Sequence, residues 1–202
     1  MKLVIPRPEI EWMLRWSQRA LFTCGMFLLS YCACLLLDAW MFQRQQRSEL
    51  ERAFQTQRQA SSPVLKTALP SAQAGLIGSI EIPRLDVSVI VVEGTTPRLL
   101  RRAAGHIAGT ALPGSPGNVG VSAHRDSFFR PLRNIRKNDI ITFRTILGTY
   151  RYRVVSTRIV APENVTVLDS GIKQVLTLVT CYPFYFVGAA PDRFIVRAER
   201  VS

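Results

Sequence analysis

The sequence predicts a mostly β protein, a small and mainly antiparallel barrel preceded by one apolar helix. About eight short β-prone runs, closely spaced turn residues and little helical periodicity follow residue 75. Eighteen consecutive residues, 20–37, carry no charge, which is close to the length a helix needs to cross the hydrocarbon core of a bilayer. With 202 residues, 48% of them hydrophobic, the chain has room for one domain with a sizeable core and this additional segment.

The apolar run predicts a transmembrane anchor over residues 20–42, with Trp40 at the membrane interface and residues 1–19 as an N-terminal segment. A secretory signal is the alternative, but the run is longer than a usual signal core and no small-x-small cleavage site precedes the returning charge. Four positive charges precede the run and four follow it, so the positive-inside rule leaves the orientation open.

Residues 43–74 are predicted to be a stalk and linker. Residues 43–60 are polar and free of proline and glycine, which favours a continued helix, and Ser61-Ser62-Pro63 would end it. The following Ala/Ser/Gln-rich piece has no hydrophobic period that would bury it. The compact domain is therefore expected over residues 75–202.

Alternating apolar residues and turn signals predict the elements of this domain. We expect strands at residues 77–82, 87–92, 118–124, 139–144, 150–155, 158–160, 175–181 and 193–199. Short helical turns are expected at residues 99–104, 128–132 and 165–169.

The net charge of +12 lies almost entirely outside the anchor, because residues 43–202 hold 22 Lys/Arg and 11 Asp/Glu, giving +11. Such a surface favours anionic lipid or cell-wall polymer. Nucleic acid is disfavoured, because the arginines are dispersed along predicted strands and no nucleic-acid-binding motif is present.

Four cysteines occur, and Cys181 is the only one after residue 34, so the domain cannot form an internal disulfide. An uncharged β-prone run precedes Cys181 and Tyr182-Pro183 follows it, which predicts a buried strand with a thiol near its exposed end. Such a thiol is either a small buried hydrophobe or a nucleophile.

A nucleophilic cysteine needs an imidazole or a guanidinium nearby to stabilise the thiolate. Of the two histidines, His106 lies at a turn and favours a structural hydrogen bond, whereas His124 ends a predicted strand and could reach the rim that holds Cys181. Arg193 opens the strand that would pair with the Cys181 strand, where it could stabilise an oxyanion. A structural role for His124 and a solvated role for Arg193 are the alternatives.

Several motifs in order resemble the sortase family. Thr177-Leu178-Val179-Thr180-Cys181 is similar to its T-L-x-T-C signature, and residues 181–184 and 190–198 resemble the end of its class C and D branches. The other matching pieces are Gly105-His106, Gly109-Thr110, Leu112-Pro113-Gly114, Gly117-Asn118 and His124-Arg125-Asp126. One departure is Ala123, which stands where the family commonly has glycine. The short domain, without large insertions, looks most like class D.

The resemblance implies an eight-stranded sortase-like barrel with an N-terminal membrane anchor. It makes Cys181 the nucleophile, His124 the general acid/base, Arg193 the group that holds substrate and oxyanion, and Thr180 a contact for the substrate backbone. The implied reaction cleaves an LPxT[G/A]-like signal near the C-terminus of a secreted protein and transfers it through a thioacyl-enzyme to an acceptor amine. No metal or other cofactor is implied. Substrates of such enzymes cross the membrane, so we expect a cytoplasmic N-terminus and an extracytoplasmic domain.

Two other functions for the domain remain as alternatives. An L,D-transpeptidase would have histidine and glycine directly before its cysteine, whereas Val179 and Thr180 stand there. A membrane-tethered β-barrel binding module with a buried, non-catalytic cysteine is the alternative from another functional class. Glu163 and Asp169 alone make no convincing calcium site.

Overall fold

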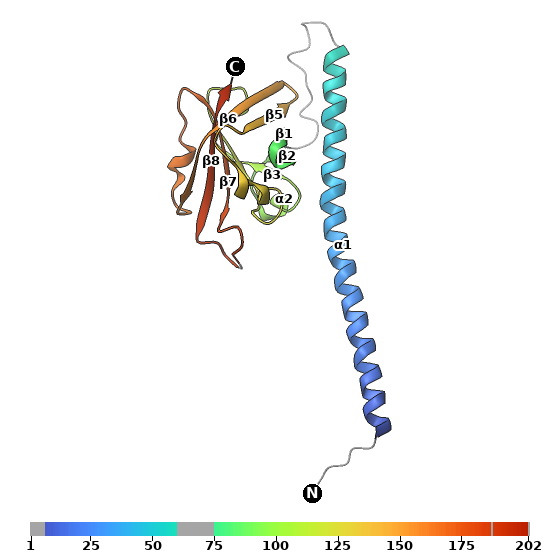
Figure 1. Ribbon diagram of the computed structural model, residues 1–202. Helices are drawn as coiled ribbons and strands as arrows, with labels where there is room; N and C mark the ends of the chain where they lie inside the picture. Colours follow the sequence, from blue (N-terminus) through green and yellow to red (C-terminus); the bar gives the residue numbers. More distant parts are fainter. Residues whose placement is uncertain (1–6, 60–74, 187, 202) are drawn as a thin grey trace. The chain divides into compact units, whose positions relative to one another are not determined.

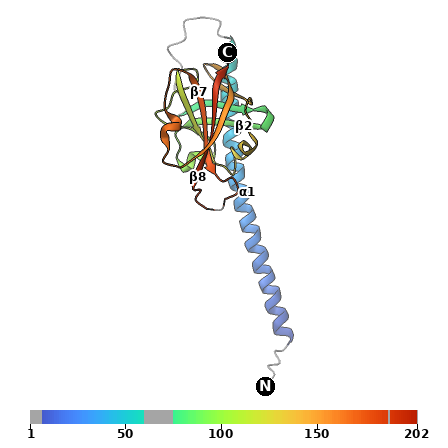
Figure 2. The same ribbon diagram turned by 60° about the vertical axis from the view of Figure 1, so that its left-hand side comes forward.

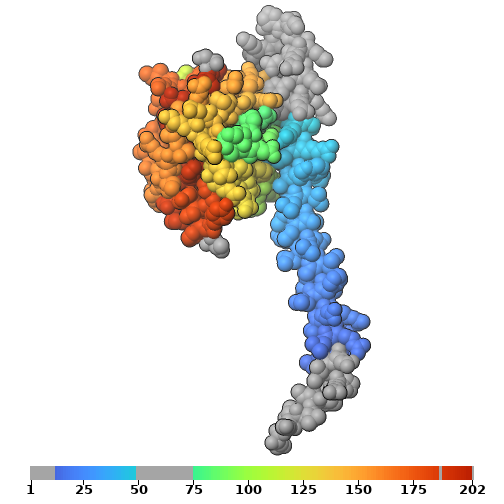
Figure 3. Space-filling view, viewed as in Figure 1, coloured from blue at the N-terminus to red at the C-terminus, as the bar shows by residue number. Residues whose placement is uncertain are grey.

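The computed structural model describes residues 7–59, 75–186 and 188–201. The chain forms two compact units, residues 1–41 and residues 42–202. Helix α1 (Arg7–Gln59) contains the expected anchor, and an apolar stretch of it, Trp12–Ser48, is long enough to cross a membrane. None of the most apolar part of that stretch is buried (Figure 3). The expected stalk continues α1 as far as Gln59, and the expected linker at residues 60–74 lies outside the described residues.

Within the second unit, the eight strands between Leu76 and Val201 form a closed barrel, which confirms the predicted fold class (Figure 1). Around the barrel the strands follow the order β1-β2-β3-β4-β7-β8-β6-β5, and β5 pairs with β1 to close it. Their bounds are β1 (Leu76–Ile82), β2 (Val87–Glu93), β3 (Ala104–His106), β4 (Gly117–Ser122), β5 (Ile140–Thr145), β6 (Gly148–Val160), β7 (Gln174–Tyr182) and β8 (Asp192–Val201).

Four short helices connect the strands, at or near the expected helical turns and at one further turn. They are η2 (Pro83–Leu85), α2 (Pro97–Leu100), η3 (Arg130–Asn134) and η4 (Val165–Leu168). Three of the four have proline in their first turn, where its fixed φ suits the helix and its missing N–H leaves no donor unsatisfied.

Strand alternation decides which side chains fill the barrel. On β7, Leu176, Leu178 and Thr180 are 0–2% exposed, and the two leucines join Val119 and Val121 of β4 in the core. Burying a leucine or valine side chain fully stabilises the fold by roughly 1.5–3 kcal/mol. Because a one-residue slip would turn every one of these side chains outward, the core fixes the register of β7. It follows that Cys181, next to inward-facing Thr180, is on the outer face.

The topology differs from the prediction of a mainly antiparallel sheet at two pairs. β2 pairs parallel with β3, and β4 pairs parallel with β7. Parallel neighbours need a long crossover. Between β4 and β7 this crossover is the whole segment from η3 to η4. The consequence is that β4 and β7 end at the same rim of the barrel, and β8, antiparallel to β7, begins there.

A buried carboxylate holds the turn before β5. Asp139, 8% exposed, accepts from Arg84 Nε at 2.5 Å, from Arg84 Nη2 at 2.6 Å and from the backbone N–H of Arg136 at 2.8 Å. The Arg84 guanidinium is the main cause that lowers the pKa of Asp139 below its ordinary value, against the opposing effect of burial. The pair joins η2 to the η3–β5 connection.

Candidate active site

The register of three strands brings Cys181, His124 and Arg193 to one rim. Cys181 lies directly opposite Arg193 in the β7–β8 pair, and the two strands run side by side (Figure 2). In the parallel β4–β7 pair, Ser122 is level with Val179, and the N–H of Ala123 still donates to the carbonyl of Val179, so His124 follows β4 at the rim where β7 carries Cys181. Neighbouring strands are about 4.8 Å apart, which is within reach of these side chains.

The Cys181 thiol is free and half-buried, on the outer face of the sheet. Its strand is fixed from the inside by the buried leucines, so the position of the sulfur depends on the core rather than on a mobile loop. Cys181 is thus partly exposed, unlike a cysteine packed as a core hydrophobe.

Backbone bonds on both sides hold the segment that carries His124. The N–H of Ala123 donates to the carbonyl of Val179 at 3.2 Å, and the carbonyl of His124 accepts from the N–H of Phe129 at 3.1 Å. Ala123 itself is 3% exposed and belongs to the core, so the methyl group that distinguishes it from glycine is packed there. His124 is half-buried and begins the turn after β4.

Thr180, the expected contact for the substrate backbone, occupies another place. Its side chain is 2% exposed inside the barrel, and its hydroxyl donates to the carbonyl of Ala123 at 2.8 Å. The reason is strand alternation, since Thr180 shares the inward face with Leu178. The hydroxyl therefore joins β7 to the residue before His124, and we assign Thr180 a positioning role in place of a side-chain contact with substrate.

The Arg193 guanidinium is anchored by the connection that precedes β8. Its Nη1 donates to the carbonyls of Asp192 at 3.0 Å and Ala190 at 3.3 Å. Arg193 forms no ion pair with any residue that the structure describes, so its charge is not neutralised by a carboxylate. A guanidinium held through one nitrogen keeps other N–H groups for an anion.

Arg125 is a site residue that the sequence reasoning did not single out. Its Nη2 donates to the carbonyls of Phe186 at 2.7 Å and Gly188 at 2.9 Å, and its guanidinium lies 5.9 Å from the centre of the Phe186 ring. These bonds join the turn after His124 to the β7–β8 connection that follows Cys181. The only sequence signal was its place directly after His124, because its partners are backbone groups far along the chain.

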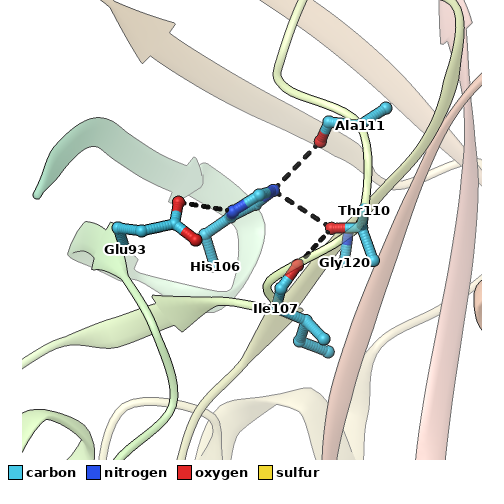
Figure 4. A network of polar contacts seen from close by, with 6 residues as sticks. All are labelled: Glu93, His106, Ile107, Thr110, Ala111 and Gly120. Atoms are coloured by element: carbon cyan, nitrogen blue, oxygen red, sulfur yellow. Dashed lines mark hydrogen bonds and ion pairs between the residues drawn. The ribbon is translucent and has the colours of Figure 1, made fainter.

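His106 serves the structure, in the manner expected from the sequence. It is 3% exposed, and Nδ1 lies 2.7 Å from Glu93 Oε2 (Figure 4). Nε2 donates to the carbonyl of Ala111 at 3.0 Å and lies 3.0 Å from Thr110 Oγ1. The Thr110 hydroxyl in turn donates to Ile107 and accepts from the N–H of Gly120. Both ring nitrogens are thus engaged, and the network fastens the β3–β4 loop to β2.

The arrangement suits acyl transfer by a thiolate. It offers a half-buried cysteine, a histidine just after the end of the neighbouring strand β4 and, on the other side, an arginine without a carboxylate partner among the described residues. Within the described ranges no three His, Cys, Asp or Glu side chains form a group that could hold a metal ion.

The sequence of this chain is similar to those of known proteins. Residues 80–201 match the family model described as "Sortase domain". Sortase D of Bacillus subtilis is 28% identical over 190 residues, covering 90% of this chain and 96% of the relative. Sortase A of Listeria monocytogenes is 30% identical over 122 residues, covering 58% and 54% of the two chains.

Solved structures give the same result. A Clostridium perfringens sortase D5 transpeptidase superposes with a TM-score of 0.65 at 22% identity, covering 80% of this chain and 99% of that one, which is a likeness of fold. Sortase C2 from a Group B Streptococcus pilus island gives a TM-score of 0.58 at 30% identity over 63% of this chain and 75% of that one. The chain belongs to the sortase family of cysteine transpeptidases, and the likeness to class D expected from its sequence is confirmed.

Proposed function

We propose that this protein is a membrane-anchored sortase that cleaves an LPxT[G/A]-like signal in secreted proteins and joins the threonyl carbonyl to an acceptor amine, attaching those proteins to the cell surface. The observation that supports the proposal is the pairing of Cys181 with Arg193 across β7 and β8, with His124 just after the end of β4, the other neighbour of β7.

In the proposed reaction the Cys181 thiolate attacks the threonyl carbonyl carbon, and the carbonyl oxygen becomes an oxyanion next to Arg193. The carbon–nitrogen bond breaks as His124 gives its proton to the leaving amine, and a thioester remains on Cys181. An acceptor amine then attacks the thioester and loses a proton to His124. The new amide forms as the thiolate leaves; attack by water in place of the amine would give hydrolysis.

The proposed topology places residues 1–19 in the cytoplasm, residues 20–42 across the membrane and residues 75–202 outside, because the secreted substrates are met there. The uncharged run inside α1 supports an anchor. The equal numbers of positive charges before and after the run favour neither orientation. A protease-sensitive tag placed after Ser202 tests this. Cleavage of the tag in intact cells by external protease is expected, and cleavage only from the cytoplasmic side would overturn the topology.

The test of the activity uses the full chain in detergent with a library of L-P-x-T-G and L-P-x-T-A peptides, read by mass spectrometry. A thioester on Cys181 and a peptide cut after threonine are expected. Cys181→Ala and His124→Ala should abolish both, while Cys34→Ala, a matched change in the anchor, should keep both. If no peptide is cut and Cys181 forms no thioester, the binding-module alternative is favoured.

A further inference from the structure

A basic segment, residues 125–137, begins directly after His124 and lies between β4 and β5. Its Phe129 and Leu132 side chains are fully buried in the core of the barrel, which fixes the segment from the inside. Its outward side chains are mainly cationic, because five positive charges and one negative charge give the segment +4. The five cations are Arg125, Arg130, Arg133, Arg136 and Lys137.

Two exposed aromatic side chains belong to the connection that follows Cys181. Tyr185 is 73% exposed and Phe186 is 45% exposed, and both lie between β7 and β8. This connection projects from the end of the barrel at which β8 begins, away from the C-terminus (Figure 1). Adjacent exposed aromatic rings on a projecting connection favour a contact with something outside the barrel.

Arginines of the basic segment hold both aromatic residues. Arg133 Nη1 donates to the Tyr185 hydroxyl, and its guanidinium carbon lies 5.3 Å from the centre of the Tyr185 ring. Arg125 Nη2 donates to the carbonyl of Phe186, and its guanidinium carbon lies 5.9 Å from the centre of the Phe186 ring. The basic segment, Tyr185 and Phe186 therefore form one continuous surface, which we call the aromatic–basic tip.

The positive charge of the tip is not neutralised by carboxylates. Arg125, Arg130, Arg133 and Lys137 form no ion pair with a residue in the described parts of the chain. Arg130, Arg133 and Lys137 are also exposed to solvent. Each lysine or arginine close to an anionic membrane surface contributes about 1 kcal/mol of attraction, so several together attract the tip strongly to such a surface.

An anionic bilayer suits both parts of the tip. Lipid phosphates pair with guanidinium and ammonium groups, and aromatic rings are favoured at the level of the headgroups. A polyanion in solution would pair with the cations but leave the two rings in water. A bilayer is also close at hand, because α1 of the same chain contains a stretch long and apolar enough to cross one.

We propose that the aromatic–basic tip docks on the anionic surface of a lipid bilayer. Docking holds the barrel by the end that carries Cys181, His124 and Arg193, so the candidate active site works close to the headgroups. The inference goes beyond the proposed function, and it does not depend on which peptide the protein cleaves.

The test measures contact of the tip with lipid in the full chain, reconstituted in vesicles after all four native cysteines are changed to alanine. A fluorophore is attached to Ser127→Cys, an exposed position in the tip. The matched control carries it on Leu147→Cys, 70% exposed in the β5–β6 turn at the other end of the barrel. Quenching by a lipid with a nitroxide on its headgroup reports contact with the bilayer.

In vesicles of equal parts phosphatidylcholine and phosphatidylglycerol, quenching at position 127 should exceed quenching at position 147 at least about threefold. The ratio should fall to about one in pure phosphatidylcholine, and also at about 1 M salt, which screens the attraction. Arg130→Gln/Lys137→Gln and Tyr185→Ser should each lower quenching at position 127 at least about threefold. Arg151→Gln/Arg153→Gln removes the same number of charges from exposed positions on β6 and should change it less than about 1.5-fold.

Two results would overturn the docking proposal. One is equal quenching at the two positions in the anionic vesicles; peptide cleavage by the unlabelled native chain in detergent, measured separately, would then still stand or fall with the proposed function. The other is protection of the label at position 127 from acrylamide by soluble polyphosphate, without quenching by the nitroxide lipid. That result would favour an anionic cell-wall polymer as the partner.

Discussion

Thr180→Val tests how the core of the barrel positions His124. Valine has nearly the shape of threonine, so the change removes the hydroxyl that donates to the carbonyl of Ala123 and little else. Since Ala123 directly precedes His124, this bond is the side-chain link between β7 and the histidine segment. We expect both stability and turnover to fall.

The magnitude follows from the burial of the pair. A lost hydrogen bond costs about 1 kcal/mol, and a buried carbonyl left without a partner raises the cost to about 1–3 kcal/mol. For a domain of this size 1 kcal/mol corresponds to roughly 2–4 °C, so a loss of about 2 kcal/mol should lower the melting temperature by about 4–8 °C. A shift of His124 by a fraction of an ångström should lower kcat by about tenfold, which is 1.4 kcal/mol of barrier.

The matched control is Thr145→Val. Thr145 is also buried, and its hydroxyl donates to the carbonyl of Gly148 at 3.2 Å in the β5–β6 turn. Strand β5 is separated from β7 by β6 and β8, so this change should lower the melting temperature without changing kcat by more than about twofold. Thermal unfolding and peptide cleavage are measured on both variants well below their melting temperatures. Equal kcat in the two variants would refute the positioning role of Thr180.

Arg193→Lys keeps the charge but loses the planar fork, and kcat should fall at least tenfold, about 1.4 kcal/mol; unchanged cleavage would remove Arg193 from the mechanism. His106→Ala should lower the melting temperature by about 5 °C or more, because Glu93 loses its buried partner, yet leave alkylation of Cys181 within about twofold of wild type. Because the folded-state pKa of Asp139 is lowered, its stabilisation is present above its ordinary pKa of 3.8 and is lost as pH falls through the lower folded value. Wild type should therefore melt above Asp139→Asn at pH 7, and the gap should close below about pH 4; a constant gap would contradict this assignment.

Local patterns in the sequence predicted most of the strands. The strand expected at residues 118–124 corresponds to β4, where the alternate residues Val119 and Val121, followed by Ala123, face the core. The same alternation applied to β7 would have placed Thr180 inside the barrel beside Leu178. A family resemblance suggested a substrate contact there, which stays a prediction; the side chain itself lies inside the barrel.

The contacts that the sequence could not supply are those between distant backbone segments. Nothing local specifies that β4 pairs with β7, because the crossover between them contains β5 and β6. The partners of Arg125 are carbonyls in another connection, which any residue type would provide. Likewise Arg133 meets Tyr185 only because the basic segment lies beside the β7–β8 connection.

The central claim is that the rim turns Cys181 into a nucleophile through His124. The direct measurement is the second-order rate of alkylation of Cys181 by iodoacetamide at pH 7, followed by mass spectrometry of the peptide that contains it. In the native full chain this rate should exceed that of the same cysteine in urea at least tenfold, and His124→Ala should remove the excess. A native rate equal to or below the unfolded rate, or one that His124→Ala leaves unchanged, would contradict the account.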